Sequence, residues 1–298
     1  IRIKNYNPMD VTLEIQLRFG ADFADIFDVR GMTHRHSGGS HTPSVADSVI
    51  EFVHEGRDRI RRMTRIRFGG EPDRIDVEDA LATAVFRVHL EPYQTRLLVV
   101  SVEPILGTED DRAAPNFDHA VHELRRSYEE WERESTQIVT DNELFNQLLD
   151  RSLRDLRALY TRVGEGGVLA AGIPWYVTIF GRDSLIASHQ LLAVNTRPAR
   201  EALELLAARQ GTEENDWRDE QPGKILHEVR DGALARAGIM PHSPYFGSVD
   251  STPWFLILYA QHLRWTGDAE FARGLLPAAE AALGWIDVIH PPAANGKV

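Results

Sequence analysis

Cysteine is absent from the chain, which excludes disulfide bonds, zinc thiolate sites and thiol catalysis. This absence favours a cytoplasmic setting, although many exported proteins also lack cysteine. No apolar run approaches the roughly 20 residues that cross a bilayer, and no secretory core follows Ile1, so we expect no membrane partner. Residue 1 is not a methionine, which leaves a cut or mature amino terminus as an alternative.

Positive charge is also scarce. The 45 acidic residues outnumber the 33 lysines and arginines, which gives a formal net charge of −12 and a pI near 5.5. Nucleic-acid binding depends on a basic surface, so the composition argues against a nucleic-acid partner. With 298 residues, 43% of them hydrophobic, the chain is long enough for one large domain or two ordinary ones.

Residues 1–110 carry the pattern of β-strands. Turn signals at Gly56-Arg57-Asp58, Gly69-Gly70 and Glu91-Pro92 separate segments in which apolar and polar residues alternate. Strands at this spacing, without intervening helices, predict an antiparallel β-sandwich domain. The expected strands are Val11 to Phe19, Ser48 to Glu55, Arg59 to Phe68, Ala82 to Leu90 and Thr95 to Pro104.

A polar loop over residues 31–44 contains His34, His36 and His41, which suggests a metal site. No carboxylate or cysteine lies among these histidines, and Gly38-Gly39 makes the loop flexible. A solvated turn is therefore the favoured interpretation, and we predict no metal site.

The second part of the chain has helical periodicity. Residues 111–140 contain a Glu/Arg-rich amphipathic pattern, which predicts a helical linker with a solvated charged face. In residues 141–298, Asn142 is expected to cap a long helix, and Pro198, Pro253 and Pro277 suit the first turns of later helices. Antiparallel helix pairs with loops at one end predict an (α/α)6 toroid, although periodicity alone also allows an irregular bundle.

The predicted fold class is therefore multidomain, with an antiparallel β-sandwich followed by an incomplete (α/α)6 toroid. The toroid is expected to be incomplete because about five or six helices follow residue 140, whereas a closed toroid has about a dozen.

Three polar signatures follow one another in the helical part, each in or beside a loop that opens onto an apolar helix. We expect these loops to line a single site on the rim of the toroid. The signatures are AGIPWYVTIFGRDS (Ala171 to Ser184), DEQPGKILHEVRDG (Asp219 to Gly232) and YFGSVDSTPW (Tyr245 to Trp254).

The first signature places Arg182 beside Asp183. A forked donor next to a bidentate acceptor suits the adjacent hydroxyls at the non-reducing end of a sugar. Alternatively, Asp183 caps the following helix and Arg182 is a surface residue. Trp175 and Tyr176 favour the sugar interpretation because aromatic faces match the apolar faces of a pyranose, although such residues also serve as core plugs.

The second signature concentrates Lys224, His227, Glu228 and Arg230 within seven positions. Close mixed charge shifts the pKa of a carboxyl group in either direction, so Glu228 is a candidate acid or sugar ligand. The alternative is a solvated, salt-bridged turn.

The third signature contains Asp250. With Pro253 in the first helical position, Thr252 is the expected cap, so Asp250 is not needed for capping. Its neighbours, including Trp254, are largely apolar, and partial burial would raise its pKa, the condition for proton donation near neutral pH. Against this, an aspartate after Gly-Ser is often a turn former.

The three signatures together resemble the helical catalytic domain of bacterial glycogen-debranching enzymes of the amylo-α-1,6-glucosidase type. The VRGMTHRH region and the strands around it resemble the amino-terminal sandwich of the same proteins, so the resemblance covers nearly all of the chain to about Asp287. It implies an inverting exo-glycosidase on an (α/α)6 barrel that releases glucose from α-1,6 branch points of glycogen or another α-glucan.

The resemblance also implies roles for individual residues. Asp250 matches the general acid. The catalytic base lies late in the barrel in this family, beyond this chain, at the roughly 6.5–9.5 Å carboxyl separation of inverting enzymes. No role is carried over to Glu228, and no metal or organic cofactor is implied because two carboxylates suffice. The expected substrate-binding residues are Trp175, Tyr176, Arg182, Asp183, Lys224, His227 and Trp254.

Two other interpretations are retained. One is a different glycosidase of the same clan, such as a trehalase-like or glucosylglycerate-type hydrolase, because the visible motifs concern the terminal hexose more than the leaving group. The other is a truncated, non-catalytic glycan-binding chain, because the sequence supplies an acid but no assignable base.

Overall fold

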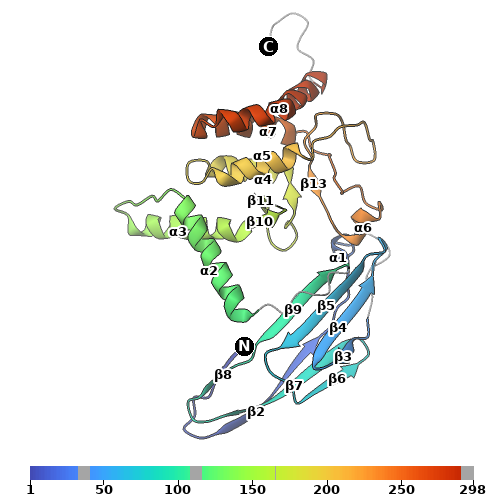
Figure 1. The fold of residues 1–298 in the computed structure, drawn as a ribbon, viewed down its shortest axis with the longest axis vertical. Helices are drawn as coiled ribbons and strands as arrows, with labels where there is room; N and C mark the ends of the chain where they lie inside the picture. Colours follow the sequence, from blue (N-terminus) through green and yellow to red (C-terminus); the bar gives the residue numbers. More distant parts are fainter. Residues whose placement is uncertain (33–40, 108–115, 165, 290–298) are drawn as a thin grey trace, which may run out of the picture. The chain divides into compact units, whose positions relative to one another are not determined.

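The computed structural model describes residues 1–32, 41–107, 116–164 and 166–289. The chain forms two compact units, each with its own core (Figure 1). Unit 1 consists of Ile1–Glu123 together with Gly232–Ala237. Unit 2 consists of Leu124–Asp231 together with the residues from Gly238 onward.

Unit 1 is built from antiparallel sheets. A three-stranded sheet has the order β2 (Val11–Phe19), β7 (Leu81–Leu90) and β6 (Arg74–Glu78). A four-stranded sheet has the order β3 (Ser44–Ala46), β4 (Val49–Glu55), β5 (Arg61–Phe68) and β9 (Val100–Leu106). A further pair joins β1 (Arg2–Lys4) to β8 (Thr95–Leu97).

The core of unit 1 lies between the two larger sheets. Ile50, Phe52 and Ile66 from one sheet are fully or almost fully buried and pack with Ala82 and Phe19 of the other. Successive side chains of a strand point to opposite faces, so the alternation in the sequence places these residues on the inner face. The predicted antiparallel β-sandwich is confirmed.

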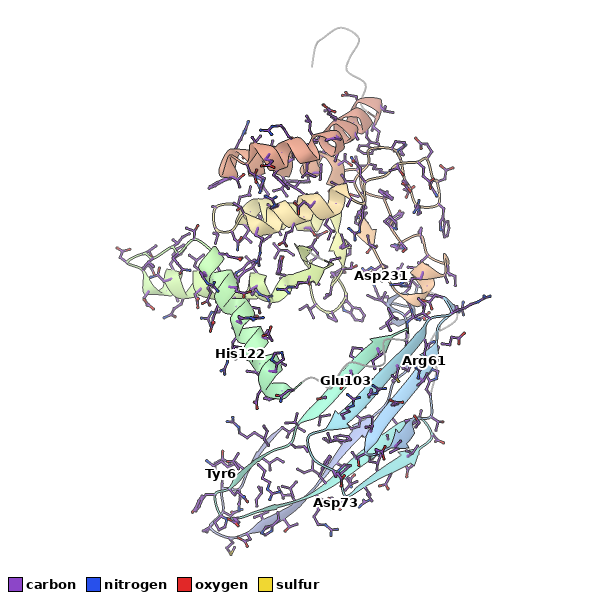
Figure 2. All side chains as sticks on the ribbon, in the orientation of Figure 1. Tyr6, Arg61, Asp73, Glu103, His122 and Asp231 are labelled. Atoms are coloured by element: carbon purple, nitrogen blue, oxygen red, sulfur yellow. The ribbon has the colours of Figure 1, made fainter. Side chains whose placement is uncertain are left out.

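The outer face of the four-stranded sheet carries cross-strand ion pairs. Arg65 Nε lies 2.6 Å from Glu51 Oε1, and Arg67 Nη1 lies 3.1 Å from Glu103 Oε1. Figure 2 labels Glu103 on β9. Arg65 and Glu51 lie directly opposite each other, whereas Arg67 and Glu103 are diagonal neighbours, and both pairs support the register of the sheet.

One predicted strand, Thr95 to Pro104, is two strands in the structure. The chain changes partner at its centre, because Leu98 N donates to Ile1 O whereas Val99 O accepts from Gly69 N. β8 therefore pairs with β1, and β9 pairs with β5. An alternating pattern continues through such a change of partner, so it does not mark the break.

Asp25 brings a distant segment into unit 1. Its Oδ1 accepts from Phe27 N at 3.0 Å and caps α1 (Ile26–Val29), and its Oδ2 accepts from Leu234 N at 3.1 Å in α6 (Ala233–Arg236). A Cβ on Gly232 would lie 2.4 Å from Asp25 Oδ2, so this approach requires glycine. The short helix α6, whose sequence follows the second polar signature, is thereby held against α1.

Unit 2 is helical. Its main helices after α2 (Phe117–Glu134) are α3 (Glu143–Leu159), α4 (Gly181–Leu191), α5 (Arg197–Ala207), α7 (Ser251–Thr266) and α8 (Ala269–Ile289). Two short antiparallel ladders accompany them, β10 (Tyr160–Val163) with β11 (Gly166–Leu169) and β12 (Ile179–Phe180) with β13 (Glu228–Val229).

The core of unit 2 is shared by four helices. α4 packs against α5 and α7, and α7 packs against α8 (Figure 1). Leu185, Leu203, Phe255 and Leu258 are fully buried among these helices, together with Ile225 from the loop between α5 and α7. Layered antiparallel helices with long loops at one end are the arrangement expected for part of a helical toroid.

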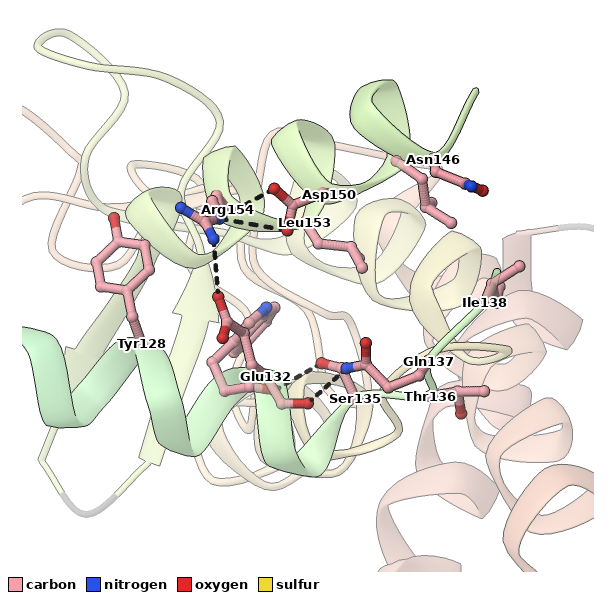
Figure 3. Close-up of a pocket in the computed structure, with 12 residues that line it drawn as sticks. Tyr128, Glu132, Ser135, Thr136, Gln137, Ile138, Asn146, Asp150, Leu153 and Arg154 are labelled. Atoms are coloured by element: carbon pink, nitrogen blue, oxygen red, sulfur yellow. Dashed lines mark hydrogen bonds and ion pairs between the residues drawn. The ribbon is translucent and has the colours of Figure 1, made fainter. Parts of the chain in front are cut away.

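Asn142 caps α3 as predicted, its Oδ1 accepting from Phe145 N at 3.1 Å. No residue of α3 is fully buried. Figure 3 shows the groove between α2 and α3, a cavity of about 130 Å³ that includes Leu153 and Arg154 in its lining. Arg154 lies 3.5 Å from Glu132 across this groove and 3.3 Å from Asp150 on its own helix.

Pro277 departs from the prediction, because it lies inside α8 instead of its first turn. α8 starts earlier, at Ala269, since Gly267 ends α7 with a positive φ of 67° and Asp268 Oδ1 accepts from Phe271 N. The capping aspartate, and not the proline, sets the start of this helix. None of the helices in the described ranges is both long and apolar enough to cross a lipid bilayer.

Candidate functional site

The three polar signatures meet through their backbones. Gly181 N donates to His227 O at 2.8 Å, and His227 N donates to Tyr245 O at 2.8 Å. Phe180 of β12 pairs with Glu228 of β13 in antiparallel register. The predicted loops therefore lie side by side at the starts of α4 and α7.

Gly181 allows the first turns of α4 and α7 to touch. A Cβ at this position would lie 2.1 Å from Leu226 O and 2.9 Å from Ser251 Oγ, so no larger residue fits without movement. α4 begins at Gly181 with Phe180 as its N-cap, and no side chain caps it. The alternative in which Asp183 caps this helix is wrong, because Asp183 already lies within the first turn.

Arg182 and Asp250 face each other across these two helix starts. Arg182 Nη1 donates to Asp250 Oδ2 at 3.2 Å, and each side chain is 46% exposed. Ser248 Oγ donates to the other carboxylate oxygen, Oδ1, at 2.5 Å and lies 2.9 Å from Ser251 Oγ. Both oxygens of Asp250 thus have partners at a surface that solvent can reach.

The expected rise in the pKa of Asp250 is wrong. Partial burial acts to raise this pKa, but the hydrogen bonds from Ser248 and Arg182, with the charge of Arg182, outweigh it and lower the pKa. Hydrogen bonds and opposite charge stabilise the ionised form. The sequence alone shows the apolar neighbours of Asp250 but not its ionic partner, which lies in another signature.

Thr252 does not cap α7 as expected. The N-cap position is occupied by Asp250, whose side chain makes no capping hydrogen bond. Thr252 is buried, and its Oγ1 accepts from Ile225 N at 2.9 Å. Ser251 N instead donates to Ser248 Oγ at 3.3 Å. The side chain of Asp250 is therefore free of a capping role, but for a different reason from the one expected.

Glu228 lies in a buried ionic cluster. Its Oε2 accepts from Arg230 Nε at 2.9 Å, and its Oε1 lies 3.1 Å from His242 Nε2. Burial lowers the pKa of His242, while the charge of Glu228 acts in the opposite direction. Arg230 Nη1 also donates to Trp175 O at 3.0 Å. The cluster ties the Trp175 loop to β13, and it is not the solvated turn that was the alternative, because Glu228 is only 8% exposed.

The aromatic side chains differ in their exposure. Trp175 and Tyr176 are each 42% exposed, so they are not core plugs. Trp254 is half-buried, with its ring 5.8 Å from that of His189. His227 lies between the rings of Phe180 and Tyr245, at centroid distances of 5.7 and 6.1 Å.

Lys224 is directed elsewhere. Its Nζ donates to Asp219 O at 2.8 Å and lies 5.6 Å from the ring centroid of Trp285 on α8. Burial lowers its pKa. The structure therefore gives Lys224 a local contact with the loop and α8, and its predicted role in substrate binding stays a prediction.

His242, Ser248 and the Tyr245–Asp219 pair were not singled out from the sequence. Ser248 lies within the third signature, two residues before Asp250, and this proximity was the available signal. His242 is followed by Ser243-Pro244, and nothing in its local pattern distinguishes it from a loop residue. Its partner Glu228 is 14 positions away, so only the fold reveals the contact.

The question of a metal centre concerns the histidine loop. Within the described residues, no group of three or more histidine, aspartate or glutamate side chains is arranged to hold a metal ion. His41 packs its ring against Phe23 and His54, at centroid distances of 5.3 and 4.8 Å. His34 and His36 lie outside the described residues.

Comparison with known families bears on the first unit. Residues 1–101 match the sequence family described as the N-terminal domain of some glycogen debranching enzymes. The resemblance inferred from the sequence is thereby confirmed for these residues. No curated protein matches the chain by sequence.

Comparison with solved structures bears on the whole fold. A structure named "Putative kojibiose phosphorylase from human microbiome" matches 93% of this chain with a TM-score of 0.58 and 11% sequence identity. This likeness confirms the fold class, an antiparallel β-sandwich followed by part of an (α/α)6 toroid. The chain spans 39% of the length of that structure.

Proposed function

We propose that this chain is part of an α-glucan glucosidase that releases glucose from α-1,6 branch points. The observation that carries the proposal is the meeting of Arg182 and Asp250 at the adjoining starts of α4 and α7, 3.2 Å apart and open to solvent. The family match of residues 1–101 supports the choice of a branched α-glucan as substrate. In this proposal, Arg182 and Asp183 hold the terminal glucose, and Asp250 protonates the glycosidic oxygen.

The ionised state of Asp250 in the free protein is compatible with an acid role only if its environment changes on binding. A sugar that engages Arg182 through its hydroxyl groups would remove the main cation from the carboxylate. The same sugar would displace water, and both changes raise a carboxyl pKa. We therefore propose that substrate binding converts Asp250 from an ion-paired carboxylate into a proton donor.

Glu228 fits a positioning role better than an acid role. Both of its oxygens have partners within the protein, Arg230 and His242. Arg230 in turn holds the carbonyl of Trp175. We propose that this cluster fixes the Trp175 loop against β13, so that the exposed ring of Trp175 has a defined position beside the sugar.

A glycoside phosphorylase is the second candidate, and the fold similarity to a structure named as a kojibiose phosphorylase favours it. Hydrolysis and phosphorolysis share a proton donor and a terminal-sugar site, and they differ in the group that attacks the anomeric carbon. The Arg182–Asp250 pair serves either reaction. The attacking group, and in an inverting hydrolase the base that activates water, is not assigned to any described residue.

The deciding experiment is product analysis. The protein is incubated with a branched limit dextrin, kojibiose or trehalose, with and without inorganic phosphate, and the released sugars are separated by anion-exchange chromatography. Glucose from the dextrin without phosphate supports debranching hydrolysis, and phosphate-dependent glucose 1-phosphate supports the phosphorylase. Glucose from trehalose alone supports the trehalase-like alternative. Saccharide binding without turnover supports a glycan-binding chain. The absence of both binding and turnover would contradict the proposal.

A further inference from the structure

Trp217 is an exposed aromatic residue on a loop that is otherwise held firmly. Its side chain is 58% exposed, although tryptophan carries a large apolar surface. Single exposed apolar residues are common on protein surfaces, so exposure alone assigns no role. The loop around Trp217, however, is tied together and is bonded to the segment that leads into Asp250.

The Trp217 loop is rigid because its two sides are bonded to each other. The backbones of Asn215 and Glu220 exchange two hydrogen bonds of 3.0 Å, and Thr212 N donates to Glu220 Oε1 at 3.0 Å. Arg218 forms ion pairs with both Glu213 and Glu220, and Glu220 is 5% exposed. A loop tied in this way holds its tip in place, and Trp217 lies exposed at that tip.

The same loop is bonded to the segment that leads into Asp250. Phe246 N donates to Arg218 O at 2.8 Å. A hydrogen bond between the Tyr245 hydroxyl and the Asp219 carboxylate raises the pKa of Tyr245. Phe246 lies four positions before Asp250 along the chain, so their Cα atoms are at most about 15 Å apart.

We propose that Trp217 is a stacking platform for a second glucosyl unit of the substrate, beyond the terminal glucose held by Arg182 and Asp183. This inference rests on the proposed function and extends it to substrate length. A fixed, amphipathic aromatic ring binds the apolar face of a sugar at little entropic cost, because neither the loop nor the two-torsion side chain must be ordered on binding. In this proposal the terminal unit does not reach the Trp217 ring, so glucose alone does not use it.

The test compares glucose with isomaltotriose by isothermal titration calorimetry of the whole chain. Trp217→Ala is expected to weaken isomaltotriose binding by about tenfold and leave glucose binding unchanged. Trp217→Phe, which keeps a flat ring, is expected to weaken isomaltotriose binding by about threefold or less. Trp265→Ala is the matched control, because Trp265 is 56% exposed but lies near the far end of α7, about 22 Å of helix from Asp250.

The outcomes separate this inference from the proposed function. If the unsubstituted protein binds both sugars and Trp217→Ala binds isomaltotriose as tightly, the platform is disproved while the proposed function stands. An equal loss for glucose and isomaltotriose also overturns the platform, because it places Trp217 at the terminal unit or in the folding of the loop. If the unsubstituted protein binds neither sugar, the proposed function fails and the inference fails with it. If Trp217→Phe loses as much affinity for isomaltotriose as Trp217→Ala does, the ring does not act by stacking.

Discussion

Arg182 and Asp250 are 68 positions apart in the chain, yet their side chains form an ion pair at 3.2 Å. Asp250 occupies the N-cap position of α7, and Arg182 lies in the first turn of α4. The positive end of the α7 dipole acts together with the Arg182 guanidinium on the carboxylate. A pair in this position connects the two helix starts and sets the charge of the residue proposed as the acid.

The first prediction concerns the role of Asp250 itself. Asp250→Asn is expected to lower turnover of a branched α-glucan by about 10²- to 10⁴-fold, because an amide cannot donate the proton that the leaving oxygen needs. Glucose binding is expected to change by only about threefold or less, because the amide keeps the shape of the side chain. Glucose release and calorimetric binding measure the two effects.

Asp268→Asn is the matched control for this variant. Asp268 is also an aspartate at a helix start, paired with an arginine, Arg200, at 2.8 Å. Asparagine caps helices as well as aspartate does, so this variant is expected to keep its activity. Near-normal turnover in Asp250→Asn would remove Asp250 from the acid role.

The second prediction concerns the pKa of Asp250, which the structure places below its ordinary value of 3.8. Arg182→Ala is expected to raise it towards that value, because an ionic hydrogen bond is lost while the bond from Ser248 remains. Carboxyl-carbon NMR titration measures the shift. Arg182→Lys keeps the positive charge but not the forked geometry of the guanidinium. In this variant, the pKa of Asp250 is expected to lie between its values in the original protein and in Arg182→Ala. An unchanged pKa in Arg182→Ala would show that the ion pair does not form in solution.

The same shift fixes the direction of any pH effect on stability. A carboxylate with a lowered folded-state pKa stabilises the fold above its ordinary pKa, and that stability is lost as the pH falls through the folded value. Both side chains are 46% exposed, so the effect is expected to be about 1 kcal/mol or less. At both pH 7 and pH 3, the free energies of unfolding in urea of the original protein and of Arg182→Ala are expected to differ by no more than this amount.

The third prediction concerns Gly181, where the starts of α4 and α7 touch. Gly181→Ala is expected to lower the free energy of unfolding by about 1–3 kcal/mol, because the new methyl group would overlap the carbonyl of Leu226. Gly274 is a suitable control, because it lies inside α8 and a Cβ added at this position would meet nothing within 4 Å. Gly274→Ala is expected to stabilise by about 0.5–1 kcal/mol. Equal stabilities of the two variants in urea would contradict the close approach.

The fourth prediction concerns the buried pair of Glu228 and Arg230, whose side chains are 11% and 8% exposed. Arg230→Met is expected to lower the free energy of unfolding by about 3–5 kcal/mol, because it leaves Glu228 buried without its main cation. Adding Glu228→Gln to the Arg230→Met variant is expected to recover part of the lost free energy of unfolding, because it removes the buried charge. A double-mutant cycle measures the coupling, and additive effects would mean that the two groups do not interact.

Much of the β-sandwich could be predicted because its long strands alternate along the whole of their length. β2 and β7 pair over nine residues, and one face of each strand reads as apolar in the sequence. The strands β1, β3 and β6 have three to five residues, too few for an alternating pattern to appear. The division of Thr95–Pro104 into two strands depends on which partners lie alongside, and the alternation does not record that.

Some helix starts were predictable from a local signal, such as the capping residue Asn142 of α3 or Pro198 in the first turn of α5, and others were not. Asn142 caps α3 through a bond three residues away, so the sequence contains the whole interaction. Thr252 was expected to cap α7 by the same reasoning, but its Oγ1 instead accepts a hydrogen bond from the backbone N–H of Ile225, 27 positions earlier. Pro277 was placed in a first turn because the cap formed by Asp268, nine residues before it, was not recognised.

The sequence by itself determined the order of a sandwich and then helices, the three polar signatures and the residues that could bind a sugar, because these depend on local periodicity and residue type. Only the tertiary structure decided the charge of Asp250 and the pairing of Glu228. Arg182 lies 68 positions from Asp250, and His242 lies 14 positions from Glu228, whereas electrostatic interactions act over ångströms in space regardless of distance along the chain.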